Sequence, residues 1–178
     1  MDEHGLREQL EKHHSESFGW ALCCCGRDRV RAEEALQRTY LKVLENKARF
    51  EGRGSFKTWL FAVIRTTARD EHRREALRRI GLLRYEAHSK AQLRAVQPAT
   101  QTPAEQSVER ARLQAVFVTA LAKLPGRQRQ TLQLVFYHDM TLAEAASVMG
   151  VSLGSARTHY ERAKAALRLR LGAEGIGP

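Results

Sequence analysis

The chain has 178 residues, with 30 Lys and Arg against 20 Asp and Glu, so its formal net charge is +10. Its 43% apolar residues are enough for a packed core, but no apolar stretch approaches the roughly 18 residues of a membrane-spanning helix. The polar start, MDEHGLREQLEKHH, is unlike a signal peptide. These features argue against secreted, membrane-inserted, collagenous and disulfide-scaffold proteins, and favour a cytoplasmic protein with a polyanionic partner.

All three cysteines are consecutive, at Cys23, Cys24 and Cys25. Neighbouring positions on a helix point about 100° apart, so the three thiols are poorly placed to bind one metal ion, and no CxxC spacing is present. We interpret them as small apolar side chains on a partly buried helix. A thiol sensor or a metal site with His13 and His14 is the alternative.

The next segment, AEEALQRTYLKVL, has the periodicity of an amphipathic helix from Ala32 to Leu44. A glycine-rich break over 51–54 follows, and Ser55 can cap the helix after it. That helix opens with an apolar face made by Phe56, Trp59, Leu60, Val63 and Ile64. It then becomes basic, with six arginines and three acids over 65–79. This order suits a helix that packs on a bundle at one end and faces phosphates at the other.

Helical periodicity disappears over 86–107, which holds Pro98 and Pro103 among many Gln, Ala, Ser and Thr residues. The composition predicts a flexible linker. We therefore expect an all-α fold of two small helical domains: an N-terminal bundle over 1–85 and a C-terminal helix-turn-helix domain over 108–178. An extended linker of this length could span roughly 70 Å, so the two domains need not touch.

The second half begins with a helical stripe that Pro125 and Gly126 interrupt. A helix over 127–138 follows, on which we expect three side chains to point inward: Leu132, Val135 and Phe136. Thr141 and Glu144 then have the spacing of a capping box. Gly150 is suited to end that short helix in the left-handed conformation.

A further helix, 153–171, is capped by Ser152 and is strongly basic. Its inner stripe is predicted to contain Ala156, Tyr160, Ala163 and Leu167, which leaves Arg157, Thr158, Glu161 and Arg162 facing outward. The short helix, the turn and this long helix form a helix-turn-helix pattern. The N-terminal part of such a recognition helix enters the major groove, where an arginine can bond guanine bidentately. An ordinary helical hairpin with a solvated basic face is the alternative.

Two stretches resemble a known family. Leu124 to Leu171, LPGRQRQTLQLVFYHDMTLAEAASVMGVSLGSARTHYERAKAALRLRL, resembles the promoter-binding domain of extracytoplasmic-function sigma factors, and Ala32 to Arg74 resembles their N-terminal domain. The resemblance covers most of the chain, excluding the linker and both ends. It implies a non-catalytic protein that binds core RNA polymerase and directs promoter-specific transcription initiation, with no cofactor, metal or small-molecule substrate. The implied partners are core RNA polymerase, promoter DNA and an anti-sigma factor.

The resemblance also implies three sets of site residues. Contacts with core polymerase fall to Glu34, Gln37, Arg38 and Leu41. The residues implied in promoter melting are Trp59, Arg65, Thr66, Asp70, Arg73 and Arg74. Trp59 lies on an apolar stripe, so its side chain is expected mainly to pack in the core. Recognition of the upstream promoter element falls to Ser152, Ser155, Arg157, Thr158, Glu161 and Arg162.

Three positions depart from the family pattern. Arg31 replaces an aspartate beside the polymerase contacts, and Thr66 replaces a common asparagine, which leaves the recognised base open. Glu161 would repel phosphates but can accept a hydrogen bond from a cytosine amine.

Two other classes of function are alternatives. A stand-alone helix-turn-helix regulator, as a dimer, would explain the second half but not the basic, tryptophan-containing first half. An enzyme would have to use Asp70, Glu71 and His72, whose side chains diverge on a helix.

Overall fold

The computed structural model describes residues 3–86 and 108–173. Within these ranges α-helices are the only regular secondary structure and no strand is present, which confirms the predicted all-α class. The helices are α1 (Glu3–Lys12), α2 (His14–Cys24), α3 (Arg29–Leu44), α4 (Phe56–Glu86), α5 (Val108–Ala122), α6 (Gly126–Phe136), α7 (Leu142–Met149) and α8 (Leu153–Ala173). The predicted linker lies outside the described residues, except for Glu86 at the end of α4.

Helix ends follow the capping signals that the sequence contains. The Ser55 hydroxyl accepts a hydrogen bond from the Thr58 backbone N–H at 3.1 Å, as predicted for the start of α4. Thr141 and Glu144 form a complete capping box, and Gly150 ends α7 with φ 59°, a left-handed conformation that glycine adopts without strain. Helix α3 begins earlier than expected, because Asp28 caps it by accepting from Arg31 N–H.

The N-terminal unit is built around Trp20 of α2. This side chain is fully buried, and its indole Nε1 donates a hydrogen bond to the Phe61 carbonyl oxygen at 2.9 Å. The Trp20 and Phe61 rings stack with centroids 5.8 Å apart. Leu60 and Ile64 of α4 are also fully buried. Trp20 therefore joins α2 to α4 by packing, stacking and a buried hydrogen bond.

The C-terminal unit has a smaller core of its own, formed by Leu121, Leu124, Leu132 and Ala163. The prediction that Phe136 points inward is wrong: this side chain is 61% exposed and stacks on Tyr160. Leu134 is fully buried instead. The reason is that α6 has two apolar faces, with Leu132 packed in the C-terminal unit and Leu134 packed against the N-terminal unit.

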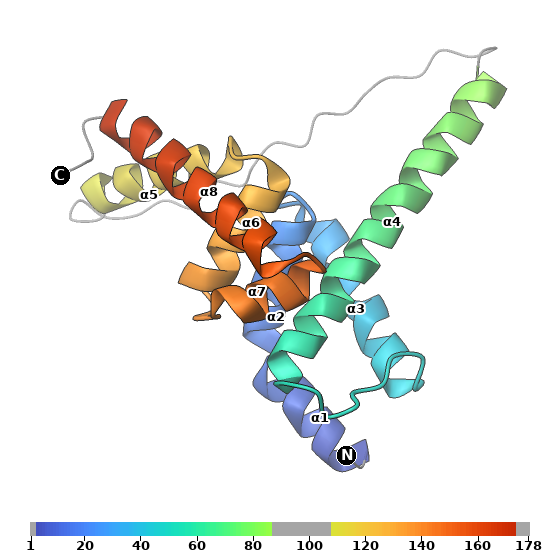
Figure 1. Ribbon diagram of the computed structural model, residues 1–178. Coiled ribbons are helices and arrows are strands. Elements are labelled where there is room, and N and C mark those ends of the chain that lie inside the picture. Colours follow the sequence, from blue (N-terminus) through green and yellow to red (C-terminus); the bar gives the residue numbers. More distant parts are fainter. Residues whose placement is uncertain (1–2, 87–107, 174–178) are drawn as a thin grey trace.

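The two halves share one core, although the sequence between them predicted that they need not touch. Leu134 and Met149, from the C-terminal unit, belong to the same buried cluster as Trp20 and Phe61. Figure 1 shows α6 and α7 lying against α2 and the first part of α4, while the far end of α4 projects away from the other helices. The described units therefore form a closed arrangement.

His138 fills the centre of this contact. It is only 6% exposed, and its ring lies edge-on to Phe61 and Trp20, with centroid distances of 4.7 and 6.2 Å. Lys57 Nζ donates to the His138 carbonyl oxygen at 3.0 Å. Burial lowers the pKa of His138 from 6.5 to about 4, and the positive charge of Lys57 acts in the same direction. The imidazole is therefore neutral in the closed chain at neutral pH.

We expect the free energy of unfolding to decrease in mild acid, before most carboxylates become protonated. Between pH 6.5 and about 4 the unfolded chain binds a proton at His138 that the folded chain does not, so stability is greatest above pH 6.5 and falls as the pH decreases. Glu16 and Asp139 raise this pKa and oppose the effect. Urea unfolding at pH 7 and pH 5 would measure it. A His138→Phe variant, which cannot titrate, should lose less stability on acidification, and equal losses would contradict the assignment.

Candidate nucleic-acid interface

The strongest candidate surface is the N-terminal half of α8. Ala156 and Ala163 are fully buried and fix the helix against its own unit. Ser152 caps it, since its hydroxyl accepts from Ser155 N–H at 3.2 Å. The six side chains predicted to read the upstream element are all exposed: Ser152, Ser155, Arg157, Thr158, Glu161 and Arg162. The predicted inner stripe and outward face are both confirmed, and the DNA contacts themselves stay a prediction.

The side chains predicted for promoter melting lie in different environments on α4. Arg73 and Arg74 are exposed, as is Thr66, whose hydroxyl donates to the Ala62 carbonyl oxygen. Asp70 and Trp59 are half-buried. The Trp59 ring lies 5.5 Å from Phe50 and 5.2 Å from Phe56, so it packs in the apolar cluster as expected.

Arg65 is the exception among the melting residues. It is only 6% exposed, and its Nε donates to the Gln130 side-chain oxygen of α6 at 3.2 Å. Burial lowers its pKa, and the nearby Arg69 charge lowers it further. In the closed arrangement this arginine serves the contact between the two units.

The predicted polymerase face of α3 is confirmed as an exposed surface. Its four residues, Glu34, Gln37, Arg38 and Leu41, all lie on the outside of the helix. Arg38 is also tied to α4, because its guanidinium pairs with the Glu71 carboxylate at 2.7 Å.

Two glutamates of α4 each hold two arginines. Glu71 pairs with Arg38 and Arg74, and Glu75 pairs with Arg31 and Arg79. We call these four ion pairs the glutamate bridges. Each pair is partly exposed and stabilises the fold by less than about 1 kcal/mol. The pairs of Arg31 and Arg38 join α3 to α4, and Glu71, one of the two acids of the Asp70–Glu71–His72 group, is occupied by Arg38 and Arg74.

The three thiols lie at the end of α2, where burial makes them weak acids. Burial raises the pKa of Cys23 and of Cys25 to about 11, and it also raises that of Cys24. His13 contacts Glu16, and His14 contacts Tyr40. Among the residues that the structure describes, no group of three metal-ligating side chains comes together.

We expect these cysteines to react slowly in the folded chain. The thiolate is the nucleophile, and a raised pKa leaves little of it at pH 7.5. Iodoacetamide labelling followed by intact mass spectrometry should show slow modification, which becomes fast in guanidinium chloride. Rapid labelling of the folded chain would instead support the thiol-sensor alternative.

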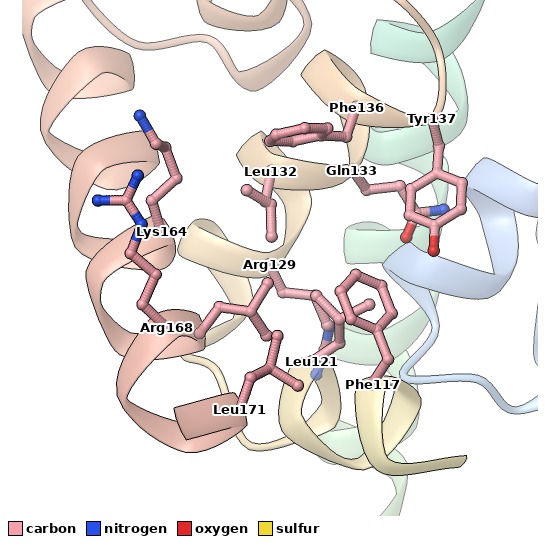
Figure 2. A pocket seen from close by; sticks show the side chains of 11 residues that line it. Phe117, Leu121, Arg129, Leu132, Gln133, Phe136, Tyr137, Lys164, Arg168 and Leu171 are labelled. Atoms are coloured by element: carbon pink, nitrogen blue, oxygen red, sulfur yellow. The ribbon is translucent and has the colours of Figure 1, made fainter. Parts of the chain in front are cut away.

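Sequence reasoning missed an apolar cavity of about 390 Å³ in the C-terminal unit. Figure 2 shows Phe117 of α5, Leu132 of α6 and Leu171 of α8 converging on it, with Lys164 and Arg168 at its edge. It lies on the Leu132 face of α6, whereas the Leu134 face meets the N-terminal unit. The C-terminal unit therefore keeps a second apolar surface that the closed arrangement leaves open.

Three residues of the contact between the units were also missed: Trp20, Lys57 and His138. The short apolar run FGWALCCC was a signal for the first. The other two are polar residues near helix ends, and their partners are distant in the chain. None of the described helices has the length and apolar character needed to span a membrane.

Comparison with known proteins gives a consistent result. Residues 10–78 match the family model of sigma-70 region 2, and residues 114–167 match that of sigma-70 region 4. The chain is 30% identical over 156 residues to the ECF RNA polymerase sigma factor EcfG of Rhodopseudomonas palustris, covering 83% of this chain and 77% of that protein. It is 27% identical over 177 residues to the ECF sigma factor SigL of Mycobacterium tuberculosis, covering 96% and 91%.

A solved structure shares the fold. The sigma factor RpoE of Bartonella quintana, crystallised with the anti-sigma factor NepR, aligns with a TM-score of 0.64 at 20% identity. The alignment covers 93% of this chain and 96% of that one.

Proposed function

Because the chain belongs to the family of extracytoplasmic-function (ECF) RNA polymerase sigma factors, which direct transcription initiation at promoters, we propose that three of its surfaces divide this work. The observation that carries the proposal is the recognition helix. Arg157, Thr158, Glu161 and Arg162 are all exposed on the half of α8 that begins at a capped N-terminus. This half of the helix is the part that enters the major groove in helix-turn-helix proteins.

We assign recognition of the upstream promoter element to this part of α8. Arg157 and Arg162 supply bidentate donors for guanine, and Glu161 supplies an acceptor for cytosine. Ser152 and Ser155 lie at the first turn, where hydroxyls and free backbone N–H groups bind phosphate. Glu161 also lies 3.6 Å from Lys164, a weak exposed pair that it can leave when DNA binds.

We assign promoter melting to α4 and docking on core RNA polymerase to the outer face of α3. The exposed arginines Arg73 and Arg74 are suited to the phosphates of a separated strand. The exposed Leu41, flanked by charged side chains, is suited to a protein partner. Two of the glutamate bridges, Arg38–Glu71 and Arg31–Glu75, join these two helices, so docking through α3 would also fix the direction of α4.

The family consists of non-catalytic regulators, and we propose that this chain has no catalytic activity and works in the cytoplasm, where core RNA polymerase is found. An anti-sigma factor is a further proposed partner. The open cavity between α5, α6 and α8, apolar inside and edged by Lys164 and Arg168, would fit an acidic amphipathic helix of such a protein.

Run-off transcription tests the proposed function directly. Core RNA polymerase from the source organism should produce defined transcripts from genomic fragments only when this chain is added. The double variant Arg157→Ala/Arg162→Ala, altered only at exposed side chains of α8, should still compete for core enzyme but should produce less of each defined transcript. Identical transcripts with and without the full chain would overturn the proposal.

The stand-alone regulator makes a different prediction. A single helix-turn-helix contacts few base pairs, and the net charge of +10 attracts any DNA. The free chain should therefore bind promoter and random duplex about equally at physiological salt, and core enzyme should create the preference. Tight, dimeric and specific binding by the free chain in a competition gel shift would favour the regulator.

A further inference from the structure

The cavity of the C-terminal unit has the size and the lining of a small-molecule site. Its volume of about 390 Å³ lies in the range of pockets that bind such ligands. Leu121 and Leu132, which line it, are buried in the core of the unit, whereas Phe136 and Tyr137, which also line it, are 61% and 58% exposed. Exposed aromatic rings beside a buried apolar lining are suited to cover an apolar ligand.

Three cations accompany this apolar lining. Lys164 and Arg168 lie one turn apart on α8 at the edge of the cavity, and Arg129 of α6 also lines it (Figure 2). Within 3–86 and 108–173, Glu161 supplies the one carboxylate at ion-pair distance from any of the three, and it lies 3.6 Å from Lys164 Nζ. The positive charges of Arg129 and Arg168 are therefore not neutralised by the described part of the chain.

Arg129 also has a buried donor without an acceptor. Its Nε is buried and has no hydrogen-bond partner among the described residues, whereas its Nη1 donates to the Ala122 carbonyl oxygen at 3.3 Å. Cys23 and Cys24 are affected by its charge, but burial raises the pKa of both thiols, so they stay neutral at pH 7 and do not balance it. A buried donor without a partner costs free energy, which an acceptor on a ligand would recover.

We propose that this cavity binds an anionic amphiphile, a molecule with one carboxylate head and an alkyl chain, such as a medium-chain fatty acid. The chain fills the apolar space between α5, α6 and α8, and the carboxylate is held by the cations that line the cavity. An arginine can bind a carboxylate through two parallel hydrogen bonds. The inference does not depend on the DNA and polymerase contacts proposed above, and such a ligand would exclude an acidic helix from the same cavity.

Titration calorimetry of the full chain with dodecanoate, below its micelle concentration and at pH 7.5, tests the proposal. We expect one dodecanoate to bind per chain. Dodecyltrimethylammonium has the same alkyl chain with a cationic head and should not bind measurably. Acetate has the head without the chain, so it measures the attraction that the net charge of +10 exerts on any small anion.

Two variants separate the contributions of head and chain, with circular dichroism to verify folding. Lys164→Gln/Arg168→Gln should weaken dodecanoate binding by at least about tenfold, because hydrogen bonds to a charged group are lost. Arg127→Gln removes an exposed arginine of α6 that does not line the cavity, so this matched control should bind as the parent does. Leu171→Trp puts a larger side chain into the cavity without changing the charge and should abolish binding.

Several results would overturn the proposal. Absence of dodecanoate binding, binding of many molecules per chain, or equally strong binding of acetate would each do so, since a defined site predicts none of them. So would an unchanged affinity in a folded Leu171→Trp variant, or equal losses in Arg127→Gln and Lys164→Gln/Arg168→Gln. If Leu171→Trp does not fold, the comparison of these two charge variants decides. Run-off transcription tests the proposed function separately, so either conclusion can fail without the other.

Discussion

Replacing Trp20 by alanine should lower the free energy of unfolding by about 3–5 kcal/mol, the range for truncating a buried aromatic side chain. The side chain has no exposed surface, stacks on Phe61 and donates a hydrogen bond to the Phe61 carbonyl oxygen. It also contacts His138, so its loss would leave a cavity bordered by both units. Urea unfolding followed by circular dichroism would measure the change.

Two variants help to interpret that result. Trp20→Phe keeps an aromatic ring but loses the indole donor, worth about 1 kcal/mol, and should destabilise the chain less than alanine does. Trp59→Ala truncates the half-buried tryptophan and should lower the free energy of unfolding by less than Trp20→Ala does. Equal losses for Trp20→Ala and Trp59→Ala would show that Trp20 is not the centre of the core.

Arg157→Ala and Arg162→Ala should each reduce promoter binding by the polymerase holoenzyme by about 1–3 kcal/mol if a bidentate contact with guanine is lost. The affinity for core RNA polymerase should change little, because both side chains are exposed on α8 and take no part in the contact between the units. Binding to a promoter and to a duplex with a scrambled upstream element would be compared by filter binding.

Arg168→Ala is the matched control, since it removes an arginine from the same helix but at the edge of the cavity. It should leave discrimination between the two duplexes unchanged. If Arg157→Ala and Arg162→Ala discriminate as well as the parent, the outward face of α8 is not the reading surface.

Much of the fold was predictable from sequence because its signals are local. The Thr141–Glu144 capping box, the Ser152 cap and the buried Ala156 and Ala163 depend on residues three to seven positions apart. The exposed faces of α3 and α8 follow from the same helical periodicity. These patterns placed most of the candidate site residues correctly with respect to solvent.

The contact between the units could not be read in this way. Leu134 and Phe136 are both apolar residues of α6, and periodicity alone does not say which one faces a second core. Arg65 lies in a basic run typical of a solvated or DNA-binding face, and its burial depends on Gln130, 65 residues later. The composition of the linker predicted that the two units could separate. Whether they do so is decided by packing between helices that are distant in the sequence.

The glutamate bridges change how binding to DNA should respond to salt. Each phosphate of duplex DNA that a protein cation neutralises releases about 0.9 of a condensed counterion, and this release sets the slope of log affinity against log salt concentration. An arginine that exchanges Glu71 or Glu75 for a phosphate leaves a carboxylate that recruits a cation from solution. Two carboxylates serve four arginines, so cation uptake at Glu71 and Glu75 offsets about half of the release when Arg31, Arg38, Arg74 and Arg79 bind phosphates. The salt sensitivity of this protein should therefore be smaller than a count of its 30 lysines and arginines alone would suggest.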